Sequence, residues 1–450
     1  MTKPNATARA FRVGRVAAYL RGHVWYLRYS DRGQRIQRKV GPDLKQARQL
    51  AAQINGQLES GAPSMLGFQP ITIAELRERW LAHHEHVRRS SLQTIHRYRT
   101  ATEHLLDFTS GTRPLSKAAE FGSREAEEFV RYLRNKRVAP NGHARARQRP
   151  LRDAGVKYIL ETCCSLFNYA AKHRHLPPYA ENPFLVIEVR RLPIEDARPV
   201  IAFTDEQSQR FLAACDDWQF PVFLTLMLTG LRPGELVHLL LPADLDLESG
   251  WLRIRNKPQL GWQVKTRNER DIPLVPVLLD VLQKLVGKRS AGPLFLQRRA
   301  VCEGYGPPLA GHSTSELQQE VLRRVVQEEG RGLVDRAARQ QVATSVWRDL
   351  GALKEDWVRV EFKRVTKRMG LAEITAPKTL RHTFATVLQD ANVDPLVRNE
   401  LMGHAPAYGS ALGMTAVYTH TRPETKRRQL EAAFAGRAAT VYAEQRNPTA

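Results

Sequence analysis

The chain has 450 residues, 42% of them hydrophobic, and its 69 Lys and Arg outnumber its 46 Asp and Glu to give a formal net charge of +23. This length suggests about three domains, and so basic a surface attracts polyanions, which makes nucleic acid the leading class of partner. The longest apolar stretch, residues 220–231, is too short to span a bilayer, so a membrane protein is not expected. The four cysteines show neither a disulfide framework nor zinc-ligand spacing, and no apolar signal segment follows the start. We therefore expect a cytoplasmic protein without a metal or other cofactor.

Residues 1–62 are expected to form a small β-sheet with one helix. The first 60 residues hold 12 Lys and Arg against 3 Asp and Glu. Segments rich in Val, Tyr and Trp predict strands at 15–20, 23–30 and 34–40. A Gly-containing hairpin turn separates the last two, and Asp43 is the expected N-cap of the helix. The candidate DNA contacts of this segment are Arg35, Arg38 and Lys39.

Residues 70–190 predict a helical domain. Thr72 and Glu75 form a capping box, and apolar periodicity predicts further helices at 91–108, 123–136 and 153–173. Residues 141–152 contain four arginines and no acidic residue. This segment is either a solvated loop or a loop that contacts phosphate, and the overall charge favours the second reading. Its candidate DNA contacts are Arg145, Arg147 and Arg149.

The block from about residue 199 to 435 is the largest predicted domain. Thr204 and Gln207 form a second capping box, and a buried helix is expected near 221–228. Strands are predicted at 251–255, 263–266 and 271–274, and the pattern is helical again from 362 to 434. The fold class is therefore mainly α with small β-sheets (α+β).

Arg232 is the first candidate for chemistry, in the segment Thr-Gly-Leu-Arg-Pro-Gly-Glu. Gly230 is suited to end one helix and Pro233 to begin the next, which leaves Arg232 at a helix N-terminus where an anion is favourably bound. Glu235, three residues on, is placed to hold the guanidinium. Because surface arginines at helix starts are common, this segment alone indicates little.

Three more segments follow in order: Leu-Arg-His-Thr-Phe-Ala-Thr at 380–386, Leu-Met-Gly-His at 401–404 and Val-Tyr-Thr-His at 417–420. Together with the Arg232 segment they resemble the tyrosine recombinase (phage integrase) family. The resemblance covers 199–432 at the level of motifs. It covers the rest more loosely, because the family often has an N-terminal arm-binding sheet and a helical core-binding domain. It implies an arm-type domain at 1–62, a core-binding domain at 70–190 and an integrase-type catalytic domain at 199–435.

The resemblance also implies roles for individual residues. Arg232 and Arg381 match the two catalytic arginines, and Lys265 matches the lysine of the β-hairpin. His404 matches the position held by His or Trp, and Tyr418 matches the nucleophile.

This set of residue types suits DNA cleavage without metal or ATP. Two arginines, each bidentate, neutralise the charge on a pentacoordinate phosphorane. A phenol suits the two roles together, attack on phosphorus and later departure, better than an alkoxide would. A lysine protonates the departing 5′ oxygen as general acid, and the histidine donates to a phosphate oxygen. The product is a 3′-phosphotyrosine with a free 5′ hydroxyl, which a partner strand can attack in turn.

The chain departs from the family pattern in two places. Lys378 stands where the family has a histidine, three residues before Arg381. A protonated lysine neutralises charge but does not accept the tyrosine's proton, so its role as base or as charge stays open. Fourteen positions separate His404 from the nucleophile, more than is usual. Tyr408 is therefore a competing nucleophile, although it lacks the Tyr-Thr-His context.

Further roles and segments are predicted. His382 is expected to orient neighbouring groups, residues 298–356 look like an insertion, and 436–450 is assigned as a C-terminal tail. The expected function is site-specific recombination for integration or excision of a mobile element. The expected partners are double-stranded DNA, further copies of the chain in a homotetramer on paired DNA sites, and a directionality factor, with no membrane.

Two alternatives stay open. A type IB topoisomerase-like relaxing enzyme shares the residues but acts as a monomer, and the basic N-terminal block argues against it. A non-catalytic DNA-binding protein derived from a recombinase is the other, for which Lys378 is the one hint.

Overall fold

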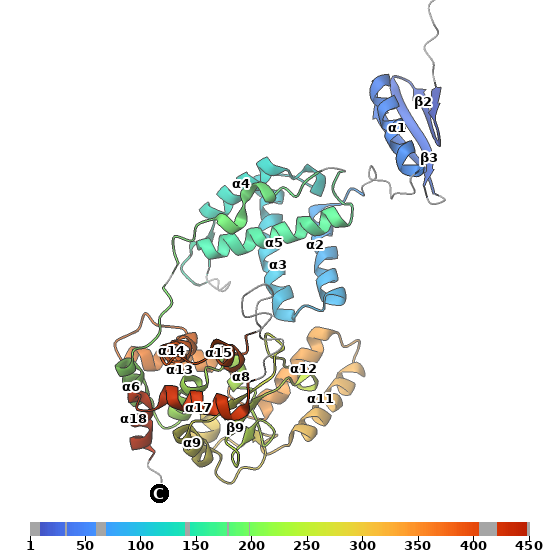
Figure 1. Ribbon diagram of the computed structural model, residues 1–450. Coiled ribbons are helices and arrows are strands. Elements are labelled where there is room, and N and C mark those ends of the chain that lie inside the picture. Colours follow the sequence, from blue (N-terminus) through green and yellow to red (C-terminus); the bar gives the residue numbers. More distant parts are fainter. Residues whose placement is uncertain are drawn as a thin grey trace, which may run out of the picture. The chain divides into compact units, whose positions relative to one another are not determined.

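The computed structural model describes residues 10–447 except 32–33, 60–68, 140–144, 178–179, 198 and 405–420 (Figure 1). It divides into two compact units, one before Pro199 and one from Pro199 onward. No helix within these described ranges is long and apolar enough to cross a membrane.

The N-terminal segment is an antiparallel sheet with one helix. Its elements are β1 (Ala10–Val13), β2 (Val16–Arg21), β3 (Val24–Asp31), β4 (Gln34–Gly41) and α1 (Leu44–Glu59), with the strands in sequential order. Alternate residues of β2 and β3, such as Val16, Trp25 and Leu27, are buried against Ile54 of α1, as the two-residue period of a strand requires. The three predicted strands and the helix are present. The short strand β1 was not predicted, because four residues carry too little alternation to be recognised.

The next segment is a helical bundle. It contains α2 (Ile73–Ala82), α3 (Leu92–Asp107), α4 (Ser123–Asn135), α5 (Asp153–Lys172) and a short hairpin of β5 (Arg137–Val138) and β6 (Arg149–Pro150). The Thr72 hydroxyl accepts a hydrogen bond from the Glu75 amide at 3.1 Å, so the predicted cap starts α2. Trp80, Phe129, Phe167 and other apolar side chains form the core.

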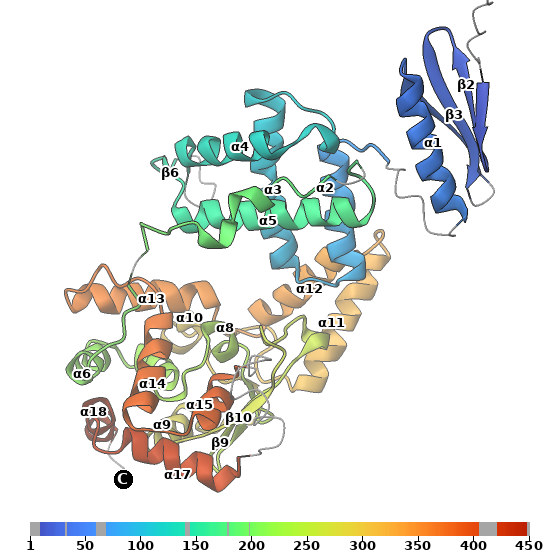
Figure 2. The same ribbon diagram turned by 45° about the horizontal axis from the view of Figure 1, so that its top comes forward.

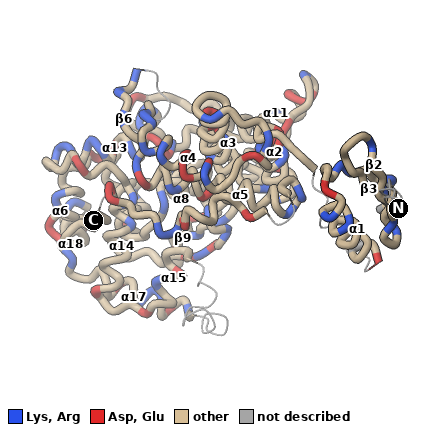
Figure 3. Tube along the Cα trace, turned by 90° about the horizontal axis from the view of Figure 1, so that it is seen from above, with Lys and Arg blue, Asp and Glu red and all other residues tan. Residues whose placement is uncertain are grey.

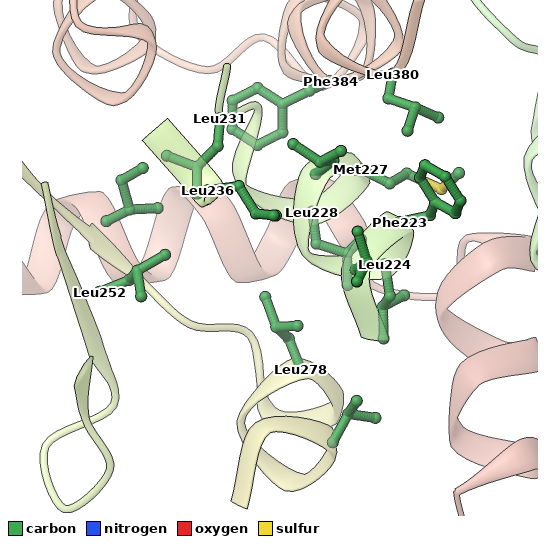
Figure 4. Close-up of a cluster of buried hydrophobic side chains, with 14 of the residues drawn as sticks. Phe223, Leu224, Met227, Leu228, Leu231, Leu236, Leu252, Leu278, Leu380 and Phe384 are labelled. Atoms are coloured by element: carbon green, nitrogen blue, oxygen red, sulfur yellow. The ribbon is translucent and has the colours of Figure 1, made fainter. Parts of the chain in front are cut away.

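The C-terminal unit is mainly helical. Its helices are α6 (Asp205–Ala213), α7 (Gln219–Thr229), α8 (Pro233–Leu236), α9 (Pro276–Val286), α10 (Arg298–Cys302), α11 (Thr314–Glu329), α12 (Arg336–Asp349), α13 (Glu355–Arg368), α14 (Lys378–Asp390), α15 (Pro395–Met402), α17 (Pro423–Phe434) and α18 (Ala438–Arg446). Every residue of α7 is buried, as expected for a helix that is apolar on all sides. Figure 4 shows Phe223, Met227 and Leu228 of α7 among side chains from α14, α9 and β9. The arrangement confirms the expected class of mainly α with small β-sheets.

Two small sheets complete this unit. One contains β10 (Arg270–Pro273), β9 (Trp251–Ile254) and β8 (Leu245–Asp246) in that order, and the other pairs β7 (Leu240–Leu241) with β11 (Gly292–Pro293). The strand predicted at 263–266 is wrong. The Val264 amide donates to the Asn256 side chain at 2.9 Å, and the Arg267 amide donates to Val264 O at 2.8 Å. These bonds close a turn instead of a ladder.

Part of the segment predicted as a C-terminal tail forms a helix, α18. Helix α18 packs on α6, where the Ala438 amide donates to Asp205 Oδ2 at 3.1 Å and Arg446 donates to the carbonyls of Leu212 and Cys215. Small buried residues of α18, Ala439 and Ala443, allow the close approach.

The stretch interpreted as an insertion forms a helical hairpin. Helices α11 and α12 lie side by side (Figures 1 and 2) and share a core that includes Leu317, Val321 and Val346. Leu240 of β7 and Leu260 belong to the same core, so the hairpin is joined to the rest of the unit by apolar contacts.

Candidate functional site

Arg232 lies between two helices whose ends are set by local sequence. Helix α7 stops at Gly230, which has φ +62°. A Cβ at Gly230 would lie 2.3 Å from Cδ1 of Phe384, so a side chain would clash there. Pro233 then begins α8, and Arg232 is its extended N-cap. The Arg232 backbone amide donates to Glu235 Oε2 at 2.9 Å and its Nη1 donates to Oε1 at 2.8 Å.

Glu235 is a buried carboxylate shared by two arginines. It is 3% exposed, and Arg270 of β10 donates to its two oxygens at 3.2 and 2.7 Å. Burial by itself raises the pKa of Glu235, but the hydrogen bonds and charges of Arg270 and Arg232 outweigh it and lower the pKa below its usual value. The group is therefore ionised at neutral pH. Arg270 Nε also donates to Leu401 O at 2.9 Å, which ties the sheet to the end of α15.

Sequence reasoning missed Arg270. The available signal was its position in β10, where Arg270 and Ile272 alternate as buried residues. A charged residue at an inward-facing strand position requires a buried counter-charge, and Glu235 supplies it.

Arg381 on α14 joins the two turns that carry the other site residues. Its Nη1 donates to Gly230 O, just before Arg232, and its Nη2 donates to Met402 O, just before His404. Burial and the nearby charge of Arg232 lower the pKa of Arg381 to about 10, so it remains a cation at neutral pH.

His404 follows a helix end that only glycine fits. Gly403 has φ +63°, and a Cβ there would lie 2.7 Å from Arg270 Nη1. Nε2 of His404 lies 3.2 Å from Nη2 of Arg381. Since a guanidinium only donates, Nε2 accepts this bond and the ring carries its proton on Nδ1. Partial burial and the charges of Arg381 and Arg232 lower the pKa of His404, so the imidazole is neutral at pH 7.

These groups are arranged so that they could hold an anion. Two guanidiniums and an imidazole meet around one place, with Glu235 as the buried counter-charge beneath them. Bidentate guanidiniums match the oxygens of a phosphate. Among the described residues, no group of three His, Cys, Asp or Glu side chains is arranged to hold a metal ion.

Residues 202–425, which include all of these positions, match the model of the phage integrase family. This part of the chain belongs to the family. The chain is 27% identical to tyrosine recombinase XerC of Pelotomaculum thermopropionicum over 250 residues, which cover 54% of this chain and 63% of that protein. The match therefore spans less than two thirds of that relative.

One further relative and one protein of similar fold come from mobile elements. The transposase from transposon Tn916 of Enterococcus faecalis is 24% identical over 238 residues, half of each chain. A solved fragment of the Tn1549 transposon integrase, in complex with transposon right end DNA, is 18% identical with a TM-score of 0.50. It covers 81% of this chain and all of that fragment, a likeness that concerns the fold.

The predicted family lysine, Lys265, lies in the turn between β9 and β10 with its side chain exposed. Its neighbour Thr266 donates a hydrogen bond to Gly403 O at 3.2 Å. The lysine turn is thus tied to the turn that carries His404.

Lys378 is the first residue of α14, one turn before His382 and Arg381, and its side chain is exposed. Burial, then the charges of Lys378 and Arg381, lower the pKa of His382. The positive charge of Lys378 therefore acts on His382, the neighbour of Arg381.

Other predicted residues lie elsewhere or outside the description. Tyr418 and Tyr408 fall in 405–420, outside the described residues. In β4, Lys39 and Arg35 pair with Tyr26 and Ser30 on the sheet face away from α1, whereas Arg38 pairs with Leu27 on the α1 side. The group in the loop at 145–149 is on the helical bundle, where Arg145 and Arg147 are exposed and Arg149 is partly buried.

Proposed function

We propose that this chain is a site-specific DNA recombinase that cleaves and rejoins double-stranded DNA through a 3′-phosphotyrosine on Tyr418. One observation carries the proposal: Arg381 is bonded to the turns before Arg232 and before His404, which gathers three motif residues at one anion site. Membership in the phage integrase family supports the same conclusion.

The chemistry follows from this arrangement. The phenol oxygen of Tyr418 attacks phosphorus, and Arg232 and Arg381 neutralise the charge that develops on the non-bridging oxygens. The P–O bond to the 5′ oxygen breaks, and Lys265 supplies the proton that this oxygen takes up. Lys378, with its exposed ammonium next to His382, contributes positive charge near the phosphate. Attack by a 5′ hydroxyl of another strand reverses these steps and releases the tyrosine.

Two basic surfaces support binding along a duplex, and Figure 3 shows Lys and Arg spread over the helices of both units. On α13, Arg359, Lys363 and Lys367 recur every four residues on one exposed face, and among the described residues none of them forms an ion pair. On the N-terminal sheet, Tyr19 and Tyr26 stack with ring centroids 5.8 Å apart. Arg28, on the same face, adds positive charge next to them. We assign both surfaces to the phosphate backbone, with the sheet as an arm-type domain and residues 70–190 as the core-binding domain.

The substrate is proposed to be the ends of a mobile element, because one relative and one protein of similar fold are proteins of transposons. Exchange of four strand ends requires four nucleophiles, so we propose a homotetramer on two DNA sites. We also propose a directionality factor as a partner, because the chain is expected to act in both integration and excision.

A nicked suicide substrate tests the nucleophile. Loss of the short 5′ fragment prevents rejoining, so the wild-type chain accumulates as a covalent complex that resists denaturing gel electrophoresis. Tyr418→Phe removes only a hydroxyl, so it is expected to abolish the complex and to bind DNA nearly as tightly. Tyr408→Phe is the matched control and is expected to form the complex normally. A complex that persists in Tyr418→Phe and disappears in Tyr408→Phe would exchange the two assignments.

Two further results separate the alternatives. Joining of strands between two labelled duplexes supports recombination, whereas relaxation of supercoiled DNA without exchange indicates the topoisomerase-like alternative. Tight binding without any covalent complex indicates a non-catalytic DNA-binding protein.

A further inference from the structure

Three aromatic rings, among them that of Trp262 three residues before Lys265, form a stack. His238, which follows α8, lies parallel to Trp262 with ring centroids 4.8 Å apart and an interplanar angle of 16°. Trp347 of α12 meets the same imidazole edge-on at 4.7 Å. The stack therefore joins three parts of the C-terminal unit: the segment after Arg232, the hairpin that carries Lys265, and the inserted helices.

The imidazole in this stack is held as a neutral group. Its Nδ1 lies 2.6 Å from Gly234 O, and because a carbonyl only accepts, Nδ1 carries the proton. Burial, with the nearby charge of Lys257, lowers the pKa of His238 to about 4 despite this bond. Lys257 itself is buried in an ion pair with Asp244 at 2.8 Å.

Helix α12 binds the tip of the β9–β10 hairpin through two hydrogen bonds. The indole nitrogen of Trp347 donates to Leu260 O at 2.8 Å, and Gln340 Nε2 donates to Gly261 O at 2.9 Å. A Cβ at Gly261 would lie 2.6 Å from the Cβ of Ala343, so the hairpin backbone touches the helix directly. Two backbone carbonyls of the hairpin thus accept hydrogen bonds from the insertion.

The carbonyls that α12 binds, those of Leu260 and Gly261, lie five and four residues before Lys265. Lys257 and Trp262 exchange backbone hydrogen bonds at 3.0 and 3.1 Å, which makes residues 257–262 a closed unit. Buried Val264 follows, and then Lys265, whose exposed side chain forms no ion pair with any described residue. The Lys265 side chain is therefore free to move. Its backbone is held on one side by the Lys257–Trp262 hydrogen bonds and on the other by the bond from Thr266 to Gly403 O.

We propose that the α11–α12 insertion is a brace that holds the lysine turn in register with Arg232 and His404, with Trp347 and His238 as positioning residues. This inference rests on the proposed function, because it assigns the brace to the step in which Lys265 protonates the 5′ oxygen. Misplacement of a general acid by about 1 Å costs on the order of 100-fold in rate. Among the described residues, the side-chain hydrogen bonds of Arg232 and Arg381 go to groups outside the brace, so we expect the steps that use these arginines to proceed without it.

A substrate with a sulfur leaving group separates these steps. In a 5′-bridging phosphorothiolate the P–S bond breaks and a thiolate leaves. Because a thiol is far more acidic than an alcohol, it needs no general acid. Trp347→Phe keeps an aromatic ring but removes the donor to Leu260 O. We expect it to cleave ordinary DNA about 10- to 100-fold more slowly and the phosphorothiolate at nearly the wild-type rate, the pattern also expected of Lys265→Ala.

Trp218→Phe is the matched control, since its indole nitrogen likewise donates to a backbone carbonyl, Leu296 O at 3.1 Å, away from the hairpin. It is expected to treat the two substrates alike. Gln340→Ala, which removes one bond from an exposed position, is the milder second variant if Trp347→Phe does not fold. Equal slowing of both substrates by the Trp347 and Gln340 variants, or no slowing of either, overturns the brace. Failure of the wild-type chain to cleave either substrate overturns the proposed function instead.

Discussion

Glu235→Gln tests whether the site depends on one buried negative charge. The Glu235 side chain is 2% exposed and accepts four hydrogen bonds, two from Arg232 at 2.8 and 2.9 Å and two from Arg270 at 3.2 and 2.7 Å. Gln has nearly the same shape, but its amide nitrogen is itself a hydrogen-bond donor and cannot accept bonds from the arginines. Removal of one partner from a buried ion pair costs about 3–5 kcal/mol. We expect the free energy of unfolding of the C-terminal unit to fall by about this amount.

Urea unfolding followed by tryptophan fluorescence measures the loss, since five of the seven tryptophans lie in this unit. Glu248→Gln, an exposed carboxylate, is the control and is expected to change the free energy of unfolding by less than about 0.5 kcal/mol. Phosphate provides a second measurement. The uncompensated arginines of Glu235→Gln bind the anion in the folded state, so added phosphate is expected to recover part of the loss.

The pH dependence has a defined sign. The pKa of Glu235 is lowered in the folded state, so its stabilising effect is complete above the unfolded pKa of about 4.5 and is lost as pH falls through the folded pKa. The difference between wild type and Glu235→Gln is therefore expected to be constant from pH 8 to pH 5 and to shrink in stronger acid. A free energy of unfolding for Glu235→Gln within about 1 kcal/mol of wild type at pH 7 refutes the reasoning. An equally large loss of this free energy in the control, Glu248→Gln, also refutes it.

Three other variants probe the remaining charges. Arg381→Lys keeps the charge but not the donors to two carbonyls, so single-turnover cleavage is expected to fall on the order of 100-fold or more; near-normal cleavage contradicts its place on the phosphate. Lys378→Arg is expected to retain substantial cleavage across pH 6 to 9, because the site uses the positive charge of this residue. An inactive Lys378→Arg together with an active Lys378→His would instead identify Lys378 as the base that accepts the tyrosine's proton. Bound phosphate favours the charged form of His404, so the pKa of His404 is expected to rise on DNA binding. Calorimetry on the acid side of neutrality is then expected to detect proton uptake by the wild-type chain that His404→Gln lacks. Equal proton uptake by both forms excludes His404 as the group that takes up the proton.

Local features of the molecule were predictable from the sequence. The caps at Thr72 and Thr204 accept hydrogen bonds from amides three residues on, so a window of four residues contains the whole signal. The motifs, through the family resemblance, implied that Arg232, Arg381 and His404 share one site. In the structure Arg381 bonds to the Gly230 carbonyl, two residues before Arg232, and lies 3.2 Å from His404. Their chemical roles, and that of Tyr418, stay predictions for the experiments above. The strand at 263–266 failed because apolar alternation does not say whether a neighbouring strand is available.

Only the tertiary structure decided what surrounds those residues. Arg270 is 35 residues from Glu235 and 131 from Leu401, yet it bonds to both. Nothing within a few residues of Arg270 marks the buried carboxylate that makes its burial possible. The same holds for α12, whose Gln340 lies 79 residues from the Gly261 carbonyl that it reaches. Backbone conformation and helix capping are set by hydrogen bonds between residues that are near in sequence. A buried charge or a backbone carbonyl without a local donor instead pairs with a residue that core packing places next to it, and that residue can be far away in sequence.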